Sequence, residues 1–196
     1  MALAMMNESR VMTSIAENFG SKKGMLKHYY YQVLDKIFNK YKRYKVVHHK
    51  PARIVFVCKG NICRSAFAEW LFKEKSNIPV CSIGLDTKTG GAANSRVAAL
   101  SEKMGVSLEA HRTTSIRDYV YQPGDSFVCM EPYQAKLLSA IYSDSQILLL
   151  GAFATNKNVY IHDPYSASDS YASNCLVHLS ECTLNLISHL DAAPRS

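Results

Sequence analysis

The stretch RIVFVC, residues 53–58, limits the possible folds more than any other part of this 196-residue chain. Its apolar side chains are continuous rather than alternating, which is typical of a strand buried on both faces of a parallel sheet. Three further short apolar runs follow, and stretches with helical spacing separate them. Strands that alternate with helices predict an α/β fold with a mainly parallel sheet.

The expected strands are residues 53–58, 79–84, 125–130 and 146–151, and the expected helices are residues 65–75, 94–105, 132–141 and 170–190. The pattern starts just after Pro51, so we expect one domain over residues 51–196 and an extension over residues 1–50. No apolar run reaches the 18 residues of a membrane span, and the N-terminus lacks the features of a secretory signal. The six cysteines are scattered, which is typical of a reducing compartment and predicts a cytoplasmic protein.

The net charge of +7 is unevenly distributed along the chain. Residues 1–52 contain ten Lys and Arg and three Asp and Glu, whereas the remaining residues contain thirteen of each. The basic character therefore belongs to the extension and not to the expected domain. This distribution argues against a nucleic-acid-binding surface on the domain, and we expect no nucleic-acid partner.

Residues 25–45 predict a basic amphipathic helix. Apolar side chains recur every three or four residues, at Leu26, Tyr30, Val33, Ile37, Tyr41 and Tyr44. Such a helix could pack on the domain, pair with a second copy, or contact acidic lipid or an acidic partner protein. Tyrosine dominates the stripe, which favours packing or protein contact over membrane binding. The sequence leaves the oligomeric state open.

The loop that follows the first strand, VCKGNICRS at residues 57–65, contains the candidate site. In open parallel sheets, ligands bind just beyond the carboxyl ends of the strands. A loop that leads from Cys58 into a helix starting near Arg64 directs backbone N–H groups inward and forms an anion site. Gly60 and Asn61 suit such a tight loop, because both tolerate unusual backbone angles.

A cysteine in this loop has the surroundings of a nucleophile. Amide dipoles and the nearby Arg64 favour the reactive thiolate form of Cys58. Arg64 offers a planar fork for two phosphoryl oxygens, and the Ser65 hydroxyl could support the thiolate. This combination predicts attack of a thiolate on phosphorus. A zinc site is disfavoured, because the two cysteines have no second pair of ligands at suitable spacing; we expect no metal and no cofactor.

The segment VCKGNICRSAFAE closely resembles the signature of low-molecular-weight protein tyrosine phosphatases, and the resemblance extends over residues 53–190. It implies a three-layer α/β/α fold of the flavodoxin-like type with a four-stranded parallel sheet. It also implies hydrolysis of phosphotyrosine through a phosphocysteine intermediate. The expected partners are proteins bearing phosphotyrosine, among them a bacterial tyrosine kinase.

The resemblance also implies roles for particular residues. Cys58 is the expected nucleophile, Arg64 the phosphate-binding cation, and Asp163 of the segment DPY the general acid and base. The substrate-binding set is Lys59, Gly60, Asn61, Ile62, Cys63, Ser65 and Tyr165, and the supporting set around Asn61 is Ser82 and His111. Cys63 is the expected redox residue, through a protective disulfide with Cys58. Glu131 is expected to be a surface or capping residue.

Three other functions remain open. A protein arginine phosphatase uses the same scaffold, but that branch has a threonine where this chain has Ile62. A thiol-coupled arsenate reductase needs a further pair of reactive cysteines in a mobile segment, which Cys129 and Cys175 fit poorly. A binding module without turnover would not need Asp163. In the loop over residues 84–94, relatives often have a large aromatic residue, whereas this chain has Lys88 and Thr89.

Overall fold

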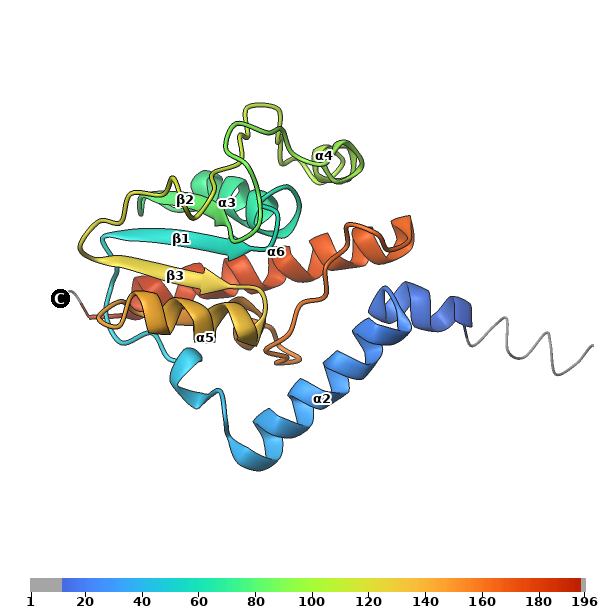
Figure 1. Ribbon diagram of the computed structural model, residues 1–196, viewed down its shortest axis with the longest axis horizontal. Coiled ribbons are helices and arrows are strands. Elements are labelled where there is room, and N and C mark those ends of the chain that lie inside the picture. The colour runs from blue at the N-terminus through green and yellow to red at the C-terminus, as the bar shows by residue number, and fades with distance from the viewer. Residues whose placement is uncertain (1–11, 195–196) are drawn as a thin grey trace, which may run out of the picture.

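The computed structural model describes residues 12–194. Its strands are β1 (Arg53–Cys58), β2 (Val80–Gly84), β3 (Asp125–Cys129) and β4 (Ile147–Leu149). Its helices are α2 (Lys22–Phe38), α3 (Arg64–Lys75), α4 (Ser95–Glu102), α5 (Pro132–Ile141) and α6 (Asp169–Ala192), with 3-10 turns η1 (Lys42–Tyr44) and η2 (Leu150–Phe153). Residues 12–19 are also helical. Helices and strands alternate from β1 onward (Figure 1).

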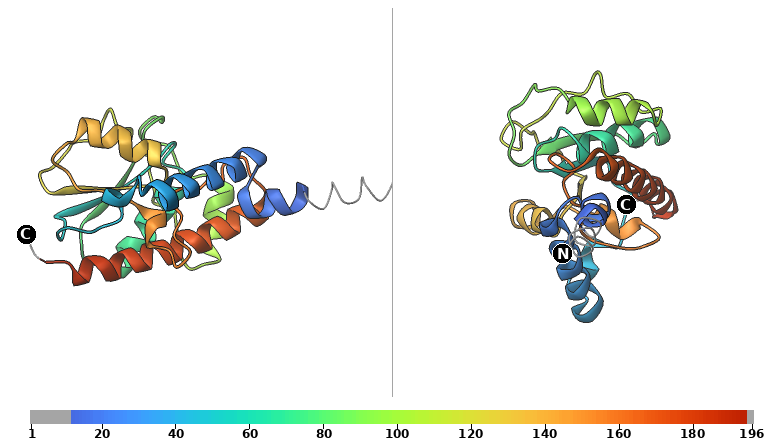
Figure 2. Two further views of the ribbon diagram at one scale, coloured as in Figure 1. Left: turned by 90° about the horizontal axis from the view of Figure 1, so that it is seen from below. Right: turned by 90° about the vertical axis from the view of Figure 1, so that its right-hand side faces the viewer.

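The four strands form one parallel sheet in the order β2-β1-β3-β4. Helices α3 and α6 cover one face of the sheet, and α5 covers the other (Figures 1 and 2). The prediction of a three-layer α/β/α fold with a four-stranded parallel sheet is therefore confirmed.

The two faces of β1 explain its continuous apolar sequence. Ile54 and Phe56 belong to the core shared with α3 and α6, whereas Val55 and Val57 belong to the core shared with α5. All four side chains are fully buried. A strand in the middle of a sheet that is covered on both sides has no polar face.

Part of the N-terminal extension completes the core on the α5 side of the sheet. Tyr41 and Tyr44 are buried there, in the same core cluster as Val55 and Val57. The prediction of one continuous helix over residues 25–45 is wrong, because α2 ends at Phe38. Asn39 adopts the left-handed conformation at φ 50° and turns the chain, as is common after a helix C-terminus.

Other boundaries differ little from the expected ones. The fourth strand stops at Leu149 and continues as η2, and α4 stops at Glu102, short of the expected end at Gly105. None of the helices within residues 12–194 combines the length and the apolar composition that crossing a membrane requires. The division of the chain at residue 51 into an extension and a domain stays a prediction.

Candidate active site

The candidate site lies at the carboxyl end of β1, in the middle of the sheet. Cys58 is the last residue of the strand, and α3 starts at Arg64 after a loop of five residues. Asn61 has φ 54° in this loop, a left-handed conformation that asparagine tolerates better than most residues. The turn brings the Asn61 amide within 3.2 Å of the Cys58 sulfur, to which it donates a hydrogen bond.

The side chain of Asn61 holds the loop together. Its Oδ1 accepts a hydrogen bond from the backbone N–H of Thr114 at 2.8 Å. Its Nδ2 donates to Ser65 Oγ at 2.9 Å and to Ser82 Oγ at 2.6 Å. Ser65 Oγ lies 3.0 Å from Cys58 Sγ. Because the Ser65 oxygen already accepts from Asn61, its own hydrogen is free to point at the sulfur and stabilise a thiolate.

His111 supports the same loop from behind. Its Nε2 lies 2.7 Å from the carbonyl oxygen of Asn61, and Trp70 Nε1 donates to its Nδ1 at 3.3 Å. Burial lowers the pKa of His111, so the ring is neutral near pH 7. These two contacts assign its proton to Nε2, which donates to the Asn61 carbonyl.

Sequence reasoning missed Glu69 as a member of this network. Ser82 donates its hydroxyl hydrogen to Glu69 Oε2, and burial raises the pKa of the Glu69 carboxyl. Glu69 lies one helical turn after Ser65 on α3. Its position could have been predicted from this spacing, because side chains four residues apart lie on the same face of a helix.

Arg64 is buried with only 1% of its surface exposed, and two acceptors hold one end of its guanidinium. Nη1 donates to Glu131 Oε1 and to the backbone oxygen of Ile161, each at 2.8 Å. Burial acts to lower the pKa of Arg64, but the negative charges of Asp163, Cys58 and Glu131 raise it on balance. The guanidinium therefore stays charged.

The other edge of the Arg64 guanidinium is available for a ligand. Nε and Nη2 are buried and have no hydrogen-bond partner among the described residues. These two nitrogens form a planar fork whose geometry suits two oxygens of a carboxylate or a phosphoryl group. Buried donors of this kind are rare and costly unless a ligand or water satisfies them.

Asp163, which is 105 positions from Cys58 in sequence, lies next to this edge. Its Oδ2 is 2.8 Å from Arg64 Nη2, an ion pair without the geometry of a hydrogen bond. Its Oδ1 accepts from the backbone N–H of Tyr165 at 3.2 Å. About a third of the Asp163 side chain is exposed, so the carboxyl can reach a bound substrate.

The expectation that Glu131 is a surface or capping residue is only half right. Glu131 is 6% exposed and is not a surface residue, although it does cap α5 in a reciprocal arrangement with Gln134. Its carboxylate also holds Arg64 Nη1, a contact that the sequence did not suggest. The residue thus couples the start of α5 to the Arg64 guanidinium.

A cavity of about 240 Å³ opens above the loop. Its lining residues are Cys58, Lys59, Gly60, Ile62, Cys63, Asp86, Asp163 and Tyr165. Tyr165 is 59% exposed and supplies the aromatic wall. Lys88 and Thr89 are not among the lining residues, and Asp86 stands at the mouth with Lys59 Nζ 3.7 Å away.

The remaining cysteines are free and mostly buried. Burial raises the pKa of the Cys63 thiol, with the charges of Asp163 and Cys58 adding to the effect. Burial also raises the pKa of Cys129 in β3 and of Cys175 in α6. Cysteines held protonated inside a strand and a helix do not form the mobile pair that an arsenate reductase needs. Among the described residues, no group of three His, Cys, Asp or Glu side chains could hold a metal ion.

Comparison with known proteins agrees with this geometry. The family model described as low molecular weight phosphotyrosine protein phosphatase matches residues 53–195. The low molecular weight protein-tyrosine-phosphatase Wzb of Salmonella typhi is 31% identical over 119 residues, 59% of this chain and 78% of that protein. The crystal structure of the Erwinia amylovora tyrosine phosphatase AmsI has a TM-score of 0.62 and 26% identity, and the match covers 74% of this chain and 95% of AmsI.

A solved arginine phosphatase shares the fold as well. YwlE from Geobacillus stearothermophilus has a TM-score of 0.63 and 21% identity, and the match covers 72% of this chain and 94% of YwlE. At that identity the likeness shows the fold alone.

Proposed function

The chain belongs to the low molecular weight phosphotyrosine protein phosphatase family, and on that premise we propose that it hydrolyses phosphotyrosine with Cys58 as the nucleophile. The substrate phosphoryl group sits in the cavity above residues 59–63, within reach of the loop amides. Arg64 binds two of its oxygens through Nε and Nη2. The phenyl ring lies against Tyr165.

In the first step, the Cys58 thiolate attacks phosphorus and the bond to the tyrosine oxygen breaks. Asp163 gives its proton to that oxygen, so the leaving group departs as neutral tyrosine. The Ser65 hydroxyl, 3.0 Å from the sulfur, holds the thiolate before attack. Arg64 and the loop amides stabilise the charge on the equatorial oxygens. The product is a phosphocysteine.

In the second step, water attacks the phosphocysteine. Asp163, now ionised, takes a proton from the water as its oxygen bonds to phosphorus. The sulfur–phosphorus bond breaks, inorganic phosphate leaves, and the Cys58 thiolate is restored. Atoms and protons balance over the two steps, because Asp163 ends the cycle with the proton that it started with.

One observation carries the proposal above the others. The Arg64 fork, Nε with Nη2, is buried and makes no hydrogen bond to the described residues, and its Nη2 lies 2.8 Å from Asp163 Oδ2. A folded chain tolerates two such orphaned donors when a ligand fills the site. A dianionic phosphoryl group matches both the charge and the spacing of the fork.

Phosphoarginine is the second candidate substrate. The arginine phosphatase YwlE shows that this fold can serve such a substrate, and Asp86 lines the cavity with a carboxylate that could attract a guanidinium. The apolar Ile62 in the loop favours a flat aromatic ester instead. We rank phosphotyrosine first, and rates on the two phosphorylated substrates with one enzyme preparation decide the order.

The test uses p-nitrophenyl phosphate and a phosphotyrosine peptide without added metal. We expect hydrolysis of both and inhibition by vanadate. Cys58→Ser should abolish turnover of both substrates. Asp163→Ala should slow turnover of the phosphotyrosine peptide by about 10²–10⁴-fold, the usual contribution of a positioned acid, and that of p-nitrophenyl phosphate by less, because p-nitrophenol is a better leaving group. Wild-type turnover by Cys58→Ser would overturn the assignment of the nucleophile.

The proposed protein substrates carry phosphotyrosine, so the enzyme class that supplies them is a tyrosine kinase. We propose a cytoplasmic location, which the six free thiols support, since disulfides are rare in reducing compartments. A disulfide between Cys63 and Cys58 under oxidation stays a proposal. The raised pKa of Cys63 makes it a slow attacking thiol.

A further inference from the structure

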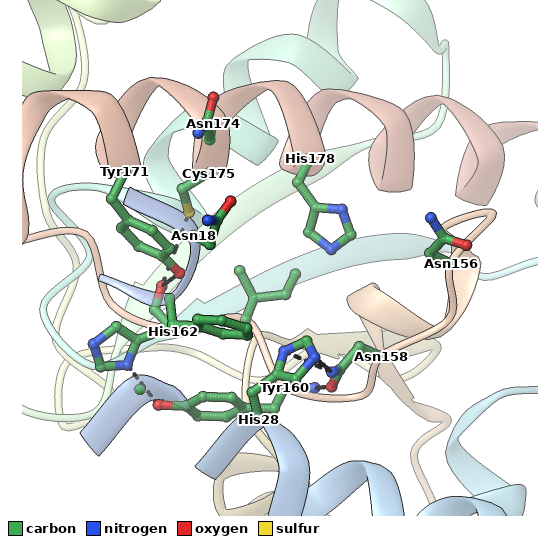
Figure 3. A pocket seen from close by; sticks show the side chains of 13 residues that line it. Asn18, His28, Asn156, Asn158, Tyr160, His162, Tyr171, Asn174, Cys175 and His178 are labelled. Carbon is green, nitrogen blue, oxygen red and sulfur yellow. Dashed lines mark hydrogen bonds between the residues drawn. The ribbon is translucent and has the colours of Figure 1, made fainter. Parts of the chain in front are cut away.

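A second cavity, of about 230 Å³, lies between the N-terminal extension and the segment that leads to Asp163 (Figure 3). The extension contributes residues 18–28 to its wall, the segment contributes residues 156–162, and α6 contributes residues 171–178. The extension lies before the start of the family match at residue 53. The extension side of this contact therefore lies outside the matched region, and the other side lies within it.

His162, the residue before Asp163, is the centre of the contact. Its Nε2 lies 3.1 Å from Ser21 Oγ, at the cap of α2, and its Nδ1 lies 2.6 Å from the hydroxyl of Tyr160. Figure 3 shows the hydrogen bond between the His162 ring and Tyr160. The backbone oxygen of His162 accepts from the Tyr171 hydroxyl at 3.3 Å. Ring and backbone are thus both held.

Two glycines allow the extension to approach His162 this closely. A Cβ atom at position 20 would lie 2.7 Å from His162 Cδ2, and a Cβ atom at position 24 would lie 2.8 Å from it. Real Cβ atoms do not approach other atoms to such distances. Gly20 also has φ 73°, which favours glycine. Glycine at positions 20 and 24 is therefore required for the extension to pack against the His162 ring.

The extension also reaches the partner of Arg64. Lys27 Nζ lies 3.8 Å from Glu131 Oε2 and 5.5 Å from the centre of the Tyr160 ring. The ring of Tyr31 lies 5.3 Å from that of Tyr160. The extension thus contacts residues beside the general acid and residues behind the phosphate-binding cation.

We propose that the N-terminal extension fixes the general acid in place through His162, which acts as a positioning residue. The inference rests on the proposed role of Asp163. Ser21 and Tyr160 orient the His162 ring, and the ring fixes the backbone from which the Asp163 carboxyl projects. Loosening either contact should misplace the acid, whereas the Cys58 sulfur keeps its contacts with Ser65 and Asn61, and Arg64 keeps its ion pair with Glu131.

The test compares two leaving groups by kcat/KM. Phenol, like the tyrosine side chain, ionises near pH 10 and needs protonation to leave, so its ester reports on the acid. p-Nitrophenol is far more acidic and leaves readily without it. Ser21→Ala and Tyr160→Phe should each lower kcat/KM for phenyl phosphate by about tenfold and that for p-nitrophenyl phosphate by less than about twofold.

Lys45→Ala is the matched control in the extension, because Lys45 pairs with Asp35 away from the site. It should leave the ratio of the two rates unchanged. Thermal melting confirms that each variant is folded. Equal losses on both substrates, or no loss with Ser21→Ala and Tyr160→Phe, would overturn the positioning role. If Asp163→Ala itself lowered both rates equally, the proposed general acid would fail instead.

The surface of α2 that faces away from the domain exposes a row of apolar side chains. We define the outward face of α2 as Leu26, Tyr30, Val33 and Ile37, which are between 49% and 70% exposed. Figures 1 and 2 show α2 along one edge of the molecule, outside the three layers. The apolar stripe expected from the sequence therefore splits, since only Tyr41 and Tyr44 turn inward.

The charge around this face indicates its partner. Residues 22–45 contain eight Lys and Arg and a single acidic residue, Asp35, which Lys45 already pairs. Two copies pressed together through this face would bring like charges into contact, which argues against a dimer. Three of the four residues of the outward face are aliphatic, and Tyr29 and Phe38 are exposed on the same helix. An exposed apolar surface flanked by lysines is typical of helices that lie in an anionic lipid interface.

We infer that the outward face of α2 docks on an anionic lipid bilayer, with its aliphatic side chains in the interface and its lysines on the headgroups. The test is cosedimentation with phosphatidylcholine vesicles that contain or lack phosphatidylserine. Wild-type protein should bind the anionic vesicles at least about tenfold more tightly, and salt should weaken that binding.

The double variant Leu26→Glu, Ile37→Glu should lose this binding. Val177→Glu is the matched control, because Val177 is 58% exposed on α6 and lies outside the face. No binding to anionic vesicles, or equal loss in the control, would overturn the inference. So would a wild-type dimer in sedimentation velocity that the double variant dissociates, since the occupant would then be a second copy. The inference would also be overturned if the double variant lost binding to an acidic protein and still bound anionic vesicles as the wild type does.

Discussion

Glu131 and Arg64 form a buried ion pair in which Glu131 Oε1 lies 2.8 Å from Nη1 of the guanidinium. The pair occupies one end of the arginine and leaves the edge formed by Nε and Nη2 without a hydrogen-bond partner among the described residues. The carboxylate thus fixes the direction in which the cation presents its free donors. Binding of a phosphoryl group depends on that direction, because a bidentate contact needs a fixed plane.

Glu131→Gln should therefore weaken oxyanion binding more than it slows chemistry. The substitution keeps the shape of the side chain and removes the charge that holds Arg64. A hydrogen bond to a charged group contributes about 1.5–3 kcal/mol, so KM for p-nitrophenyl phosphate and Ki for vanadate should rise about tenfold or more. Steady-state kinetics measure both constants. Glu181→Gln, at an exposed carboxylate of α6, is the control, and equal constants in the two variants would contradict the role of Glu131.

Two substitutions of Asn61 should distinguish how much its side-chain hydrogen bonds and its left-handed backbone conformation each contribute to stability. Asn61→Gly keeps access to φ 54° and loses the hydrogen bonds to Ser65, Ser82 and Thr114. Asn61→Ala loses the same bonds and adds the strain of a left-handed residue, about 1–2 kcal/mol. Urea unfolding should thus rank the stability as wild type, then Gly, then Ala. An alanine variant as stable as the glycine variant would show that the loop relaxes when the side chain is lost.

The sheet could be predicted because its signal is local and repeated. The apolar run of β1 indicates burial on both faces of the sheet. In the helices between the strands, apolar side chains recur every three or four residues. The break after Phe38 could not be predicted from the apolar spacing. Asn39 suits a helix end, but the apolar spacing continues through Tyr41 and Tyr44 as if the helix did too.

The site could be predicted only where a motif spans it. Cys58, Arg64 and Asp163 belong to two short motifs, and the structure brings them together. Glu131 lies 67 positions from Arg64, and capping of α5 already accounts for an acidic residue there. The contact of His162 could not be predicted from a motif, because its partner Ser21 lies 141 positions away in the extension. Pairs of this kind depend on tertiary packing, which single-sequence patterns do not encode.

Stability should fall as the pH drops below about 6.5, the ordinary pKa of histidine. Burial lowers the pKa of His28, His111, His162 and His178. The unfolded chain therefore binds protons that the folded chain excludes, so this part of the stability is complete above pH 6.5 and is lost on acidification. Each such proton contributes a slope of at most about 1.4 kcal/mol per pH unit. Urea midpoints at pH 7.5 and pH 5.5 measure the effect.

His178→Gln should reduce this loss, because it removes one of the four groups. His178 lies on α6, away from Cys58, so kcat at pH 7 should not change. A urea midpoint that is equal at the two pH values in the wild-type protein would contradict the prediction. A loss that is unchanged in His178→Gln would assign the effect to the other three histidines.

Two tyrosines of the extension test whether it folds together with the sheet. Tyr44 is 6% exposed, its hydroxyl lies 3.2 Å from Ser139 Oγ, and its ring belongs to the core that covers Val55 and Val57. Tyr44→Ala should lower the free energy of unfolding by about 3–5 kcal/mol, as for other large buried aromatic side chains. Tyr30→Ala, at a residue 56% exposed on α2, should change it by less than about 0.5 kcal/mol. Urea unfolding followed by circular dichroism measures both values. A small, equal effect of the two substitutions would mean that the extension detaches before the sheet unfolds, whereas a single transition with a large loss for Tyr44→Ala alone would mean that the two unfold as one unit.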